Sequence, residues 1–191
     1  MNIAVSRKTR DLSVYTANNI GQWCVAGIPS REWAHTLFPE MDEEEAFEKL
    51  EDAIFTVSRV DEENDPLDNW EKHDAELVEH AKKMTEYAFD SLHFTSELGT
   101  DITVGLVKDH IWAGGNGCTQ SGILFDPNIP TEEIFCMPDN TRINGTVYAS
   151  KPLLFSGKRI ENFHLTFKDG KGVDYDAEKG KETLKQLLET D

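Results

Sequence analysis

The sequence predicts an α+β fold, in which a helical first half is followed by a β-rich, mostly antiparallel second half and a closing helix. Apolar residues before Leu92 recur every three or four positions, which is the spacing of one helix face. After Leu92 they alternate with polar or small residues, as in strands. Leucines at helical spacing return near the end. We therefore expect a mainly helical part, 1–92, and a β-rich part, 93–191.

The helical part is expected to begin with a strand and a brief helix. Gln22 to Ile28 is a short apolar run that Pro29 ends, which favours a buried strand. Ser30 can then cap a helix that runs to Leu37, since a serine side chain accepts a hydrogen bond from the first helical turn.

Two longer amphipathic helices should follow. Asp42 and Glu45 have the spacing of a capping box, and the helix they start should end near Val60. The next should begin at Asp65 and Pro66, because proline is tolerated in the first turn, and should be about 25 residues long. The expected buried stripes are Phe47, Leu50, Ile54 and Val57 in the first helix and Trp70, Leu77, Ala81, Met84 and Ala88 in the second.

The β-rich part should consist of short strands and one terminal helix. The strands are expected around 102–106, 111–112, 143–149, 153–155 and 160–167. Lys108-Asp109 can form a turn, and Asp169-Gly170 is typical of a hairpin turn. The closing helix should start near Ala177, with Asp176 as its cap, and bury its leucines.

Charge and composition exclude several classes of partner. The formal net charge is -17, from 36 acidic and 19 basic residues, so a nucleic-acid or anionic-membrane surface is not expected. No apolar run approaches the roughly 20 residues of a membrane span, and the first ten residues lack the apolar stretch of a signal peptide. Cys24, Cys118 and Cys136 are far apart in the sequence, which favours reduced thiols. We therefore expect a cytoplasmic protein.

Most motifs for catalysis are absent from the sequence. His73 and His80 lack the H-E-x-x-H spacing of a zinc pair, so a solvated or boundary position is expected for both. No G-x-S-x-G motif occurs. Gly114, Gly115 and Gly117 resemble a phosphate loop but lack its lysine, so a turn is expected there and a nucleotide-binding domain is disfavoured.

Residues 125–135, FDPNIPTEEIF, contain the strongest candidate site. The two prolines make the segment irregular, and Glu132 and Glu133 directly precede the apolar pair Ile134-Phe135. A carboxylate at the edge of a buried strand needs a cation or several hydrogen-bond donors to remain charged. The pattern is compatible with a metal or substrate-amine site and also with a capped turn or a surface acid pair.

Several stretches in consistent order resemble the thermophilic aminopeptidases, a family of metal-dependent peptidases. The resemblance runs from Trp23 to Asp191. The matching stretches are WCVAGIPSREWAHTLFP, NDPLDNWEKHDAEL, GTDITVGL, FDPNIPTEEIF, NGTVYASKPLLFSGKRIENFHLTFKDGKG and AEKG. The resemblance implies removal of N-terminal residues from peptides by a pair of divalent metal ions, zinc, cobalt or similar. It also implies that Glu133 is a metal ligand, that Glu132 is its neighbour, and that the complete enzyme is a homodimer.

The resemblance also implies that the other metal ligands lie outside these residues. We therefore expect a chain truncated at both ends, which on its own neither binds metal stoichiometrically nor hydrolyses peptides. The alternative is a non-catalytic acidic α+β binding or assembly module on a peptidase-like scaffold, because a fold does not determine a function.

Overall fold

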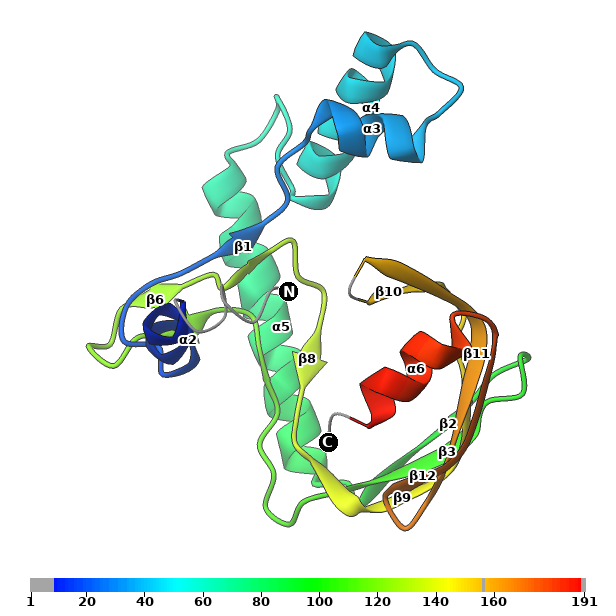
Figure 1. The fold of residues 1–191 in the computed structure, drawn as a ribbon. Coiled ribbons are helices and arrows are strands. Elements are labelled where there is room, and N and C mark those ends of the chain that lie inside the picture. Colours follow the sequence, from blue (N-terminus) through cyan, green and yellow to red (C-terminus); the bar gives the residue numbers. More distant parts are fainter. Residues whose placement is uncertain (1–8, 156, 190–191) are drawn as a thin grey trace. The chain divides into compact units, whose positions relative to one another are not determined.

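The computed structural model describes residues 9–155 and 157–189. The described chain forms two compact units, each built from two separate segments. The helical unit contains residues 9–83 and 113–135, and the sheet unit contains residues 84–112, 136–155 and 157–189. These units are defined by packing alone, so the division into parts 1–92 and 93–191 stays a prediction. The predicted fold class is confirmed, since helices dominate the first half and antiparallel strands the second (Figure 1).

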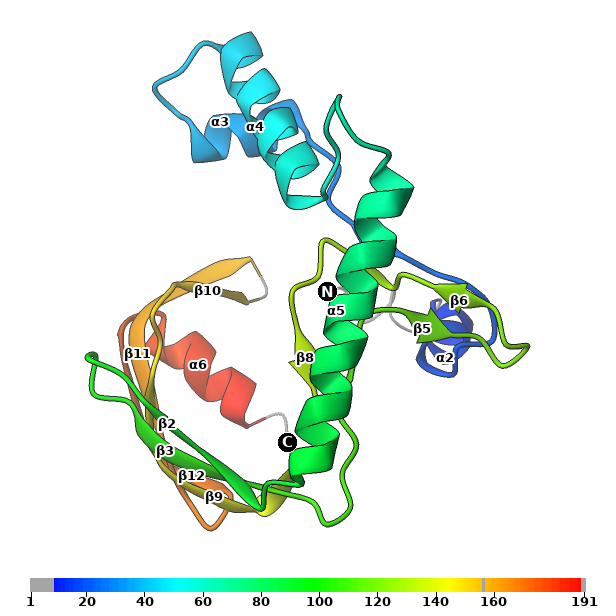
Figure 2. The ribbon, with the colours of Figure 1, turned by 180° about the vertical axis from the view of Figure 1, so that it is seen from behind.

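The helical unit combines helices with short paired strands. Its helices are α2 (Arg10–Ala17), α3 (Arg31–Leu37), α4 (Glu43–Val57) and most of α5 (Pro66–Tyr87). Its strands are β1 (Val25–Ala26), β4 (Ala113–Gly114), β5 (Gly117–Cys118), β6 (Leu124–Phe125), β7 (Asn128–Ile129) and β8 (Ile134–Phe135). Strand β1 pairs with β7 in parallel, whereas β4 with β8 and β5 with β6 are antiparallel pairs. Figure 2 shows β5 and β6 side by side, as this pairing requires.

The helix starts agree with the capping signals in the sequence. The Ser30 side chain accepts a hydrogen bond from the Trp33 amide at 3.2 Å, and Asp42 accepts one from the Glu44 amide at 3.0 Å. Pro66 is the first residue of α5, as predicted. A small core between α3 and α4 contains Ala34, Ala46 and Leu50, with Phe38, Met41, Phe47 and Ile54 packed against it.

The expectation of a buried strand over Gln22 to Ile28 is wrong. Only Val25 and Ala26 form a strand there, and the Val25 side chain is 61% exposed. An apolar run alone does not show whether anything covers it. Here β1 has a single partner, β7, which leaves its other edge unpaired among the described strands.

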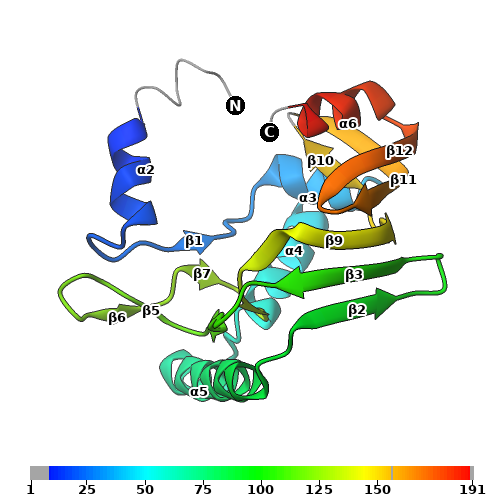
Figure 3. The same cartoon turned by 90° about the horizontal axis from the view of Figure 1, so that it is seen from below.

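The sheet unit contains one larger, mostly antiparallel sheet and the closing helix. Its elements are β2 (Ser91–Thr95), β3 (Asp101–Leu106), β9 (Pro138–Tyr148), β10 (Leu153–Phe155), β11 (Lys158–Lys168), β12 (Lys171–Lys179) and α6 (Lys181–Leu188). The order is β10-β11-β9-β3-β2, and β12 also pairs with β11. Figure 3 shows β2, β3 and β9 as neighbouring strands. Ile160 of β11 and Leu184 of α6 are its largest fully buried side chains.

The structure changes three details of the expected β-rich part. Strand β2 was not predicted, and residues 111–112 do not form the expected return strand. The expected helix start at Ala177 is also wrong, because β12 continues to Lys179. Helix α6 begins only after Gly180, whose φ of 77° turns the chain in a conformation that favours glycine.

The hairpin turn predicted at Asp169-Gly170 is confirmed. It joins β11 to β12, with φ of 49° at Asp169 and 78° at Gly170. Positive φ at both central residues is the requirement of a type I′ turn, which suits the twist of an antiparallel hairpin. Across residues 9–155 and 157–189, no helix is both long and apolar enough to cross a membrane.

Candidate functional site

The two adjacent glutamates before β8 have different environments. One oxygen of Glu132 lies 2.6 Å from the Arg59 guanidinium, and the other lies 3.8 Å from Nε2 of His73. The imidazole Nε2 of His73 also lies 2.7 Å from the Thr131 carbonyl oxygen, to which it must donate because a carbonyl only accepts. Glu132 is 68% exposed, so its ion pair contributes at most about 1 kcal/mol to stability. Its main effect is to fix the 131–133 segment against α5.

Helices α4 and α5 hold the groups that bind Glu132. Arg59 follows α4 with a φ of 58°, and the Asn69 side chain donates to its carbonyl oxygen at 3.1 Å. The Arg59 guanidinium lies 5.5 Å from the centre of the Trp70 ring, a cation–π distance. The Trp70 indole N–H donates to the Ser58 carbonyl at 2.8 Å. These contacts hold Arg59 in the position in which it pairs with the Glu132 carboxylate.

His73 is buried, so the expected solvated or boundary position is wrong. Its side chain is 8% exposed and meets the Trp70 ring edge-on, with 5.6 Å between ring centres. The spacing of the histidines in the sequence could not identify a histidine that binds a backbone carbonyl 58 residues away.

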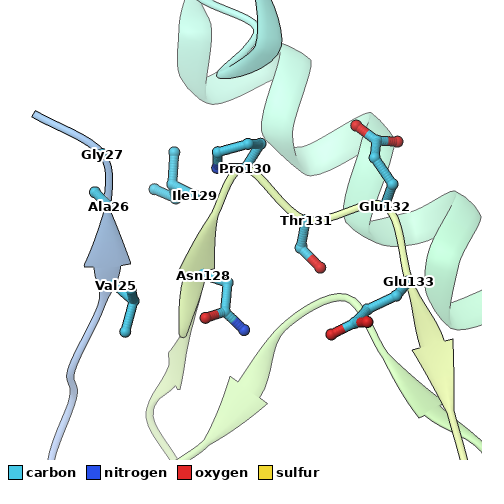
Figure 4. Close-up of a pocket in the computed structure, with 9 residues that line it drawn as sticks. All are labelled: Val25, Ala26, Gly27, Asn128, Ile129, Pro130, Thr131, Glu132 and Glu133. Carbon is cyan, nitrogen blue, oxygen red and sulfur yellow. The ribbon is translucent and has the colours of Figure 1, made fainter. Parts of the chain in front are cut away.

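Glu133 points to the opposite side from Glu132 (Figure 4). It lies at a pocket of about 680 Å³ lined by residues 25–27 and 128–133. Figure 4 shows the side chains of Asn128, Thr131 and Glu133 directed to the same side of the segment. Within the part of the chain that the structure describes, none of these three side chains has a hydrogen-bond or ion-pair partner. Their oxygen atoms are therefore free to bind a cation or a polar ligand.

Two glycines allow close packing around β8, the strand that follows Glu133. A Cβ atom at Gly114 would lie 2.6 Å from the Ile134 side chain and 2.9 Å from the Glu133 carbonyl oxygen. At Gly115, where φ is +75°, it would lie 3.0 Å from the Asp74 carbonyl oxygen of α5. The glycines therefore let β4 and its turn pack closely against both β8 and α5. The turn expected in this glycine cluster is found between β4 and β5.

A second pair of carboxylates lies under this turn. Burial raises the pKa of Asp74 from 3.8 to about 6, and a hydrogen bond and charge repulsion from Asp126 add to that effect. One oxygen of Asp74 is buried without a hydrogen-bond partner among the described residues. Burial is thus the main cause of the raised pKa, and the nearby Asp126 carboxylate adds to it, so only one of the two acids readily carries charge.

Removal of the Asp74 charge should stabilise the protein at neutral pH. Because the pKa of Asp74 is raised, the folded chain keeps this proton over a pH range in which the unfolded chain loses it. The resulting loss of folding stability grows from about pH 4 to about pH 6 and remains constant above that. We expect Asp74→Asn to be neutral near pH 4 and to stabilise by about 1 kcal/mol near pH 7.5, allowing for solvent screening. Urea unfolding at both pH values tests this, with Asp68→Asn, an exposed aspartate of α5, as control. A constant difference across pH would contradict it.

The donor set around Glu133 fits one metal-ligand position. A free carboxylate with an amide and a hydroxyl beside it is suited to a hard or borderline divalent cation. Within residues 9–155 and 157–189, however, no three His, Cys, Asp or Glu side chains gather in a way that could hold a metal ion. Glu133 as a metal ligand thus stays a prediction.

Comparisons with known proteins identify the family. The model of the thermophilic metalloprotease (M29) family matches residues 1–191. Aminopeptidase AmpS of Bacillus subtilis is 43% identical over 177 residues, which cover 93% of this chain and 43% of AmpS. Aminopeptidase T of Thermus aquaticus is 42% identical over 188 residues, which cover 98% of this chain and 46% of that protein.

A solved structure supports the same relationship. Wild-type AmpT from Thermus thermophilus matches with a TM-score of 0.89 and 36% identity, over 97% of this chain and 45% of that chain. The chain thus spans about half the length of the relatives it matches. The resemblance seen in the sequence motifs is confirmed, and the chain belongs to the thermophilic metalloprotease (M29) family.

Proposed function

We propose that this chain is a portion of a metal-dependent aminopeptidase that removes N-terminal residues from peptides, and that Glu133 is one of its metal ligands. The observation that carries the proposal is the contrast between the two glutamates. Glu132 is held by Arg59, whereas Glu133 has no partner among the described residues and is directed to the other side of the chain. The contacts of Glu132 fix the 131–133 segment, so the Glu133 carboxylate stays at the pocket.

The role of each residue follows from its contacts. Glu133 would hold a divalent ion, and the ion would supply Lewis acidity toward the peptide carbonyl. Arg59 and His73 would act as positioning residues, because they hold Glu132 and the Thr131 carbonyl and so set the direction of Glu133. The Asn128 and Thr131 side chains would be available to hydrogen-bond the peptide backbone.

Several finer features belong to the same proposal. The complete enzyme would use two divalent ions, zinc, cobalt or similar, and would act as a cytoplasmic homodimer. The aminopeptidase names of the relatives support peptide substrates. A catalytic zinc has about three protein ligands, and a two-metal site needs bridging groups between like charges. We therefore propose that the remaining ligands lie in the part of the relatives' length that this chain does not span, and that the 191 residues alone are inactive.

Metal content and turnover test this proposal together. The 191-residue chain, dialysed after exposure to zinc or cobalt, should retain no stoichiometric metal and should not cleave an aminoacyl reporter. The full-length protein should retain metal and cleave the reporter. Tight one-to-one metal binding or measurable turnover by the 191 residues would overturn the proposal that their metal site is incomplete. A full-length protein with neither property would favour the non-catalytic module.

A further inference from the structure

A second pocket lies next to the pocket of Glu133 in the helical unit. It has a volume of about 300 Å³ and includes the rings of Trp23, Phe125 and Phe135, with Pro127. The backbone of residues 113–117 forms another wall. This volume is at the lower end of the roughly 300–1,000 Å³ that ligand pockets occupy, so it suits one large side chain better than a whole peptide.

Two residues connect this pocket to Glu133. Asn128 lines both pockets. Phe135 is the last residue of β8 and comes two positions after Glu133. Side chains two positions apart along an extended chain share a face and lie about 7 Å from each other. A ligand whose polar end lies at the Glu133 carboxylate can therefore place a side chain of a few carbon atoms against the Phe135 ring.

The walls of the pocket are uncharged and well supported. The Trp23 and Phe125 rings pack with 5.8 Å between their centres, and the Trp23 indole donates to the Asn19 side chain at 3.1 Å. A Cβ atom at Gly117 would lie 3.1 Å from the Phe125 ring. The absence of a side chain at Gly117 therefore lets its backbone pack closely against that ring. No Asp, Glu, Lys, Arg or His side chain lines the pocket among the described residues.

One aromatic wall is open to a ligand. Phe135 is 59% exposed, and no aromatic or cationic side chain of the described residues stacks on its ring. Covering an exposed apolar ring removes apolar surface from water, which favours binding of an apolar ligand group. Because Phe135 lines a pocket without charged side chains among the described residues, an apolar ligand group is favoured over a charged one.

From these observations, and resting on the function proposed above, we propose that the pocket of Trp23, Phe125 and Phe135 receives the side chain of the N-terminal residue of the peptide. The enzyme would then favour peptides that begin with a large, uncharged apolar residue, such as leucine or phenylalanine. Peptides that begin with glycine or with a charged residue would be poorer substrates.

Direct binding to the 191-residue chain provides the first test. The amides of phenylalanine, leucine and glycine are titrated separately into the isotope-labelled chain and followed by NMR. The resonances of the Gly114 and Gly117 amides and of the Trp23 indole should shift with the phenylalanine and leucine amides and stay unchanged with the glycine amide. Phe135→Ala should reduce these shifts, whereas Leu124→Ala should not, because Leu124 is equally exposed (61%) but lies outside the pocket. Equal effects of all three amides, or none, would overturn the proposal.

Turnover by the full-length protein provides the second test. Phe135→Ala should lower kcat/KM for leucine and phenylalanine reporters about tenfold relative to an alanine reporter, and Phe135→Leu should restore much of the difference. Leu124→Ala should leave the preference unchanged. If the full-length protein is active but the Phe135 variants keep the substrate preference of the unsubstituted protein, the pocket assignment is wrong while the aminopeptidase function stands. Absence of any turnover would overturn the proposed function instead, and the binding measurement would then decide the pocket alone.

Discussion

Glu133→Gln in the full-length protein should reduce kcat for an aminoacyl reporter by about a thousandfold. The substitution keeps the size of the side chain but removes the negative charge that a metal ligand supplies. Loss of about 4 kcal/mol of transition-state stabilisation from a misplaced or missing ion corresponds to this factor. Steady-state turnover and the metal content of the dialysed variant are measured together, and both should fall.

The neighbouring glutamate provides the matched control. Glu132→Gln weakens the ion pair with Arg59 but leaves the carboxylate of Glu133 intact. We expect it to reduce kcat by less than about tenfold, because it acts only through the position of its neighbour and an exposed ion pair contributes little. If Glu132→Gln lost activity and metal while Glu133→Gln kept both, the two residues would have been assigned in the wrong order.

Gly145→Ala should destabilise the sheet unit by about 3 kcal/mol or more. Gly145 has a φ of +122° in β9, which L side chains rarely adopt. A Cβ atom there would lie 2.2 Å from the Asp101 carbonyl oxygen and 2.7 Å from the Ile102 Cα. The strain and the clash with β3 act together, so the strand pair must separate or shift. The free energy of unfolding in urea, followed by circular dichroism, measures the effect.

A second glycine of the same sheet provides the control for Gly145→Ala. Gly172 in β12 has no positive φ in the left-handed region, and no heavy atom of the described residues lies within 4 Å of the position of its Cβ. Gly172→Ala should therefore change the free energy of unfolding by less than about 0.5 kcal/mol. Equal effects of the two substitutions would contradict the close approach of β9 to β3.

The features that the sequence predicted well have local causes. Helices α4 and α5 follow from apolar spacing together with the cap at Asp42 and the first-turn proline Pro66, and each of these signals acts within one or two turns. The Asp169-Gly170 turn follows from two residues that tolerate positive φ. Each signal acts over a few neighbouring residues, so tertiary contacts did not need to be known.

The details that the sequence did not predict depend on distant partners. Strand β2 has one half-buried residue and is otherwise exposed, so it lacks a strong apolar alternation and is stabilised by pairing with β3. Asp176 has the residue type of a helix cap, but pairing with His164 of β11 extends β12 past it. The tertiary context overrides the local preference in both cases.

The candidate site likewise combines features with local causes and features that depend on distant residues. Glu132 and Glu133 stood out from their position before an apolar pair and from the family resemblance, but Arg59, which distinguishes them, lies 73 residues from Glu132. No local pattern identifies such a partner. Asp74 likewise interacts with Asp126, which lies 52 residues further along the chain.

The discontinuous helical unit has a consequence for the order of events on the ribosome. Residues 9–83 are synthesised before residues 113–135, so β1 obtains its partner β7, and Arg59 and His73 obtain Glu132, only after the second segment has been made. At about 5–20 residues per second, some 50 further residues require several seconds. During that delay α5 has neither the glycine turn nor the 131–133 segment against it, and the nascent chain is then most open to chaperones and proteases.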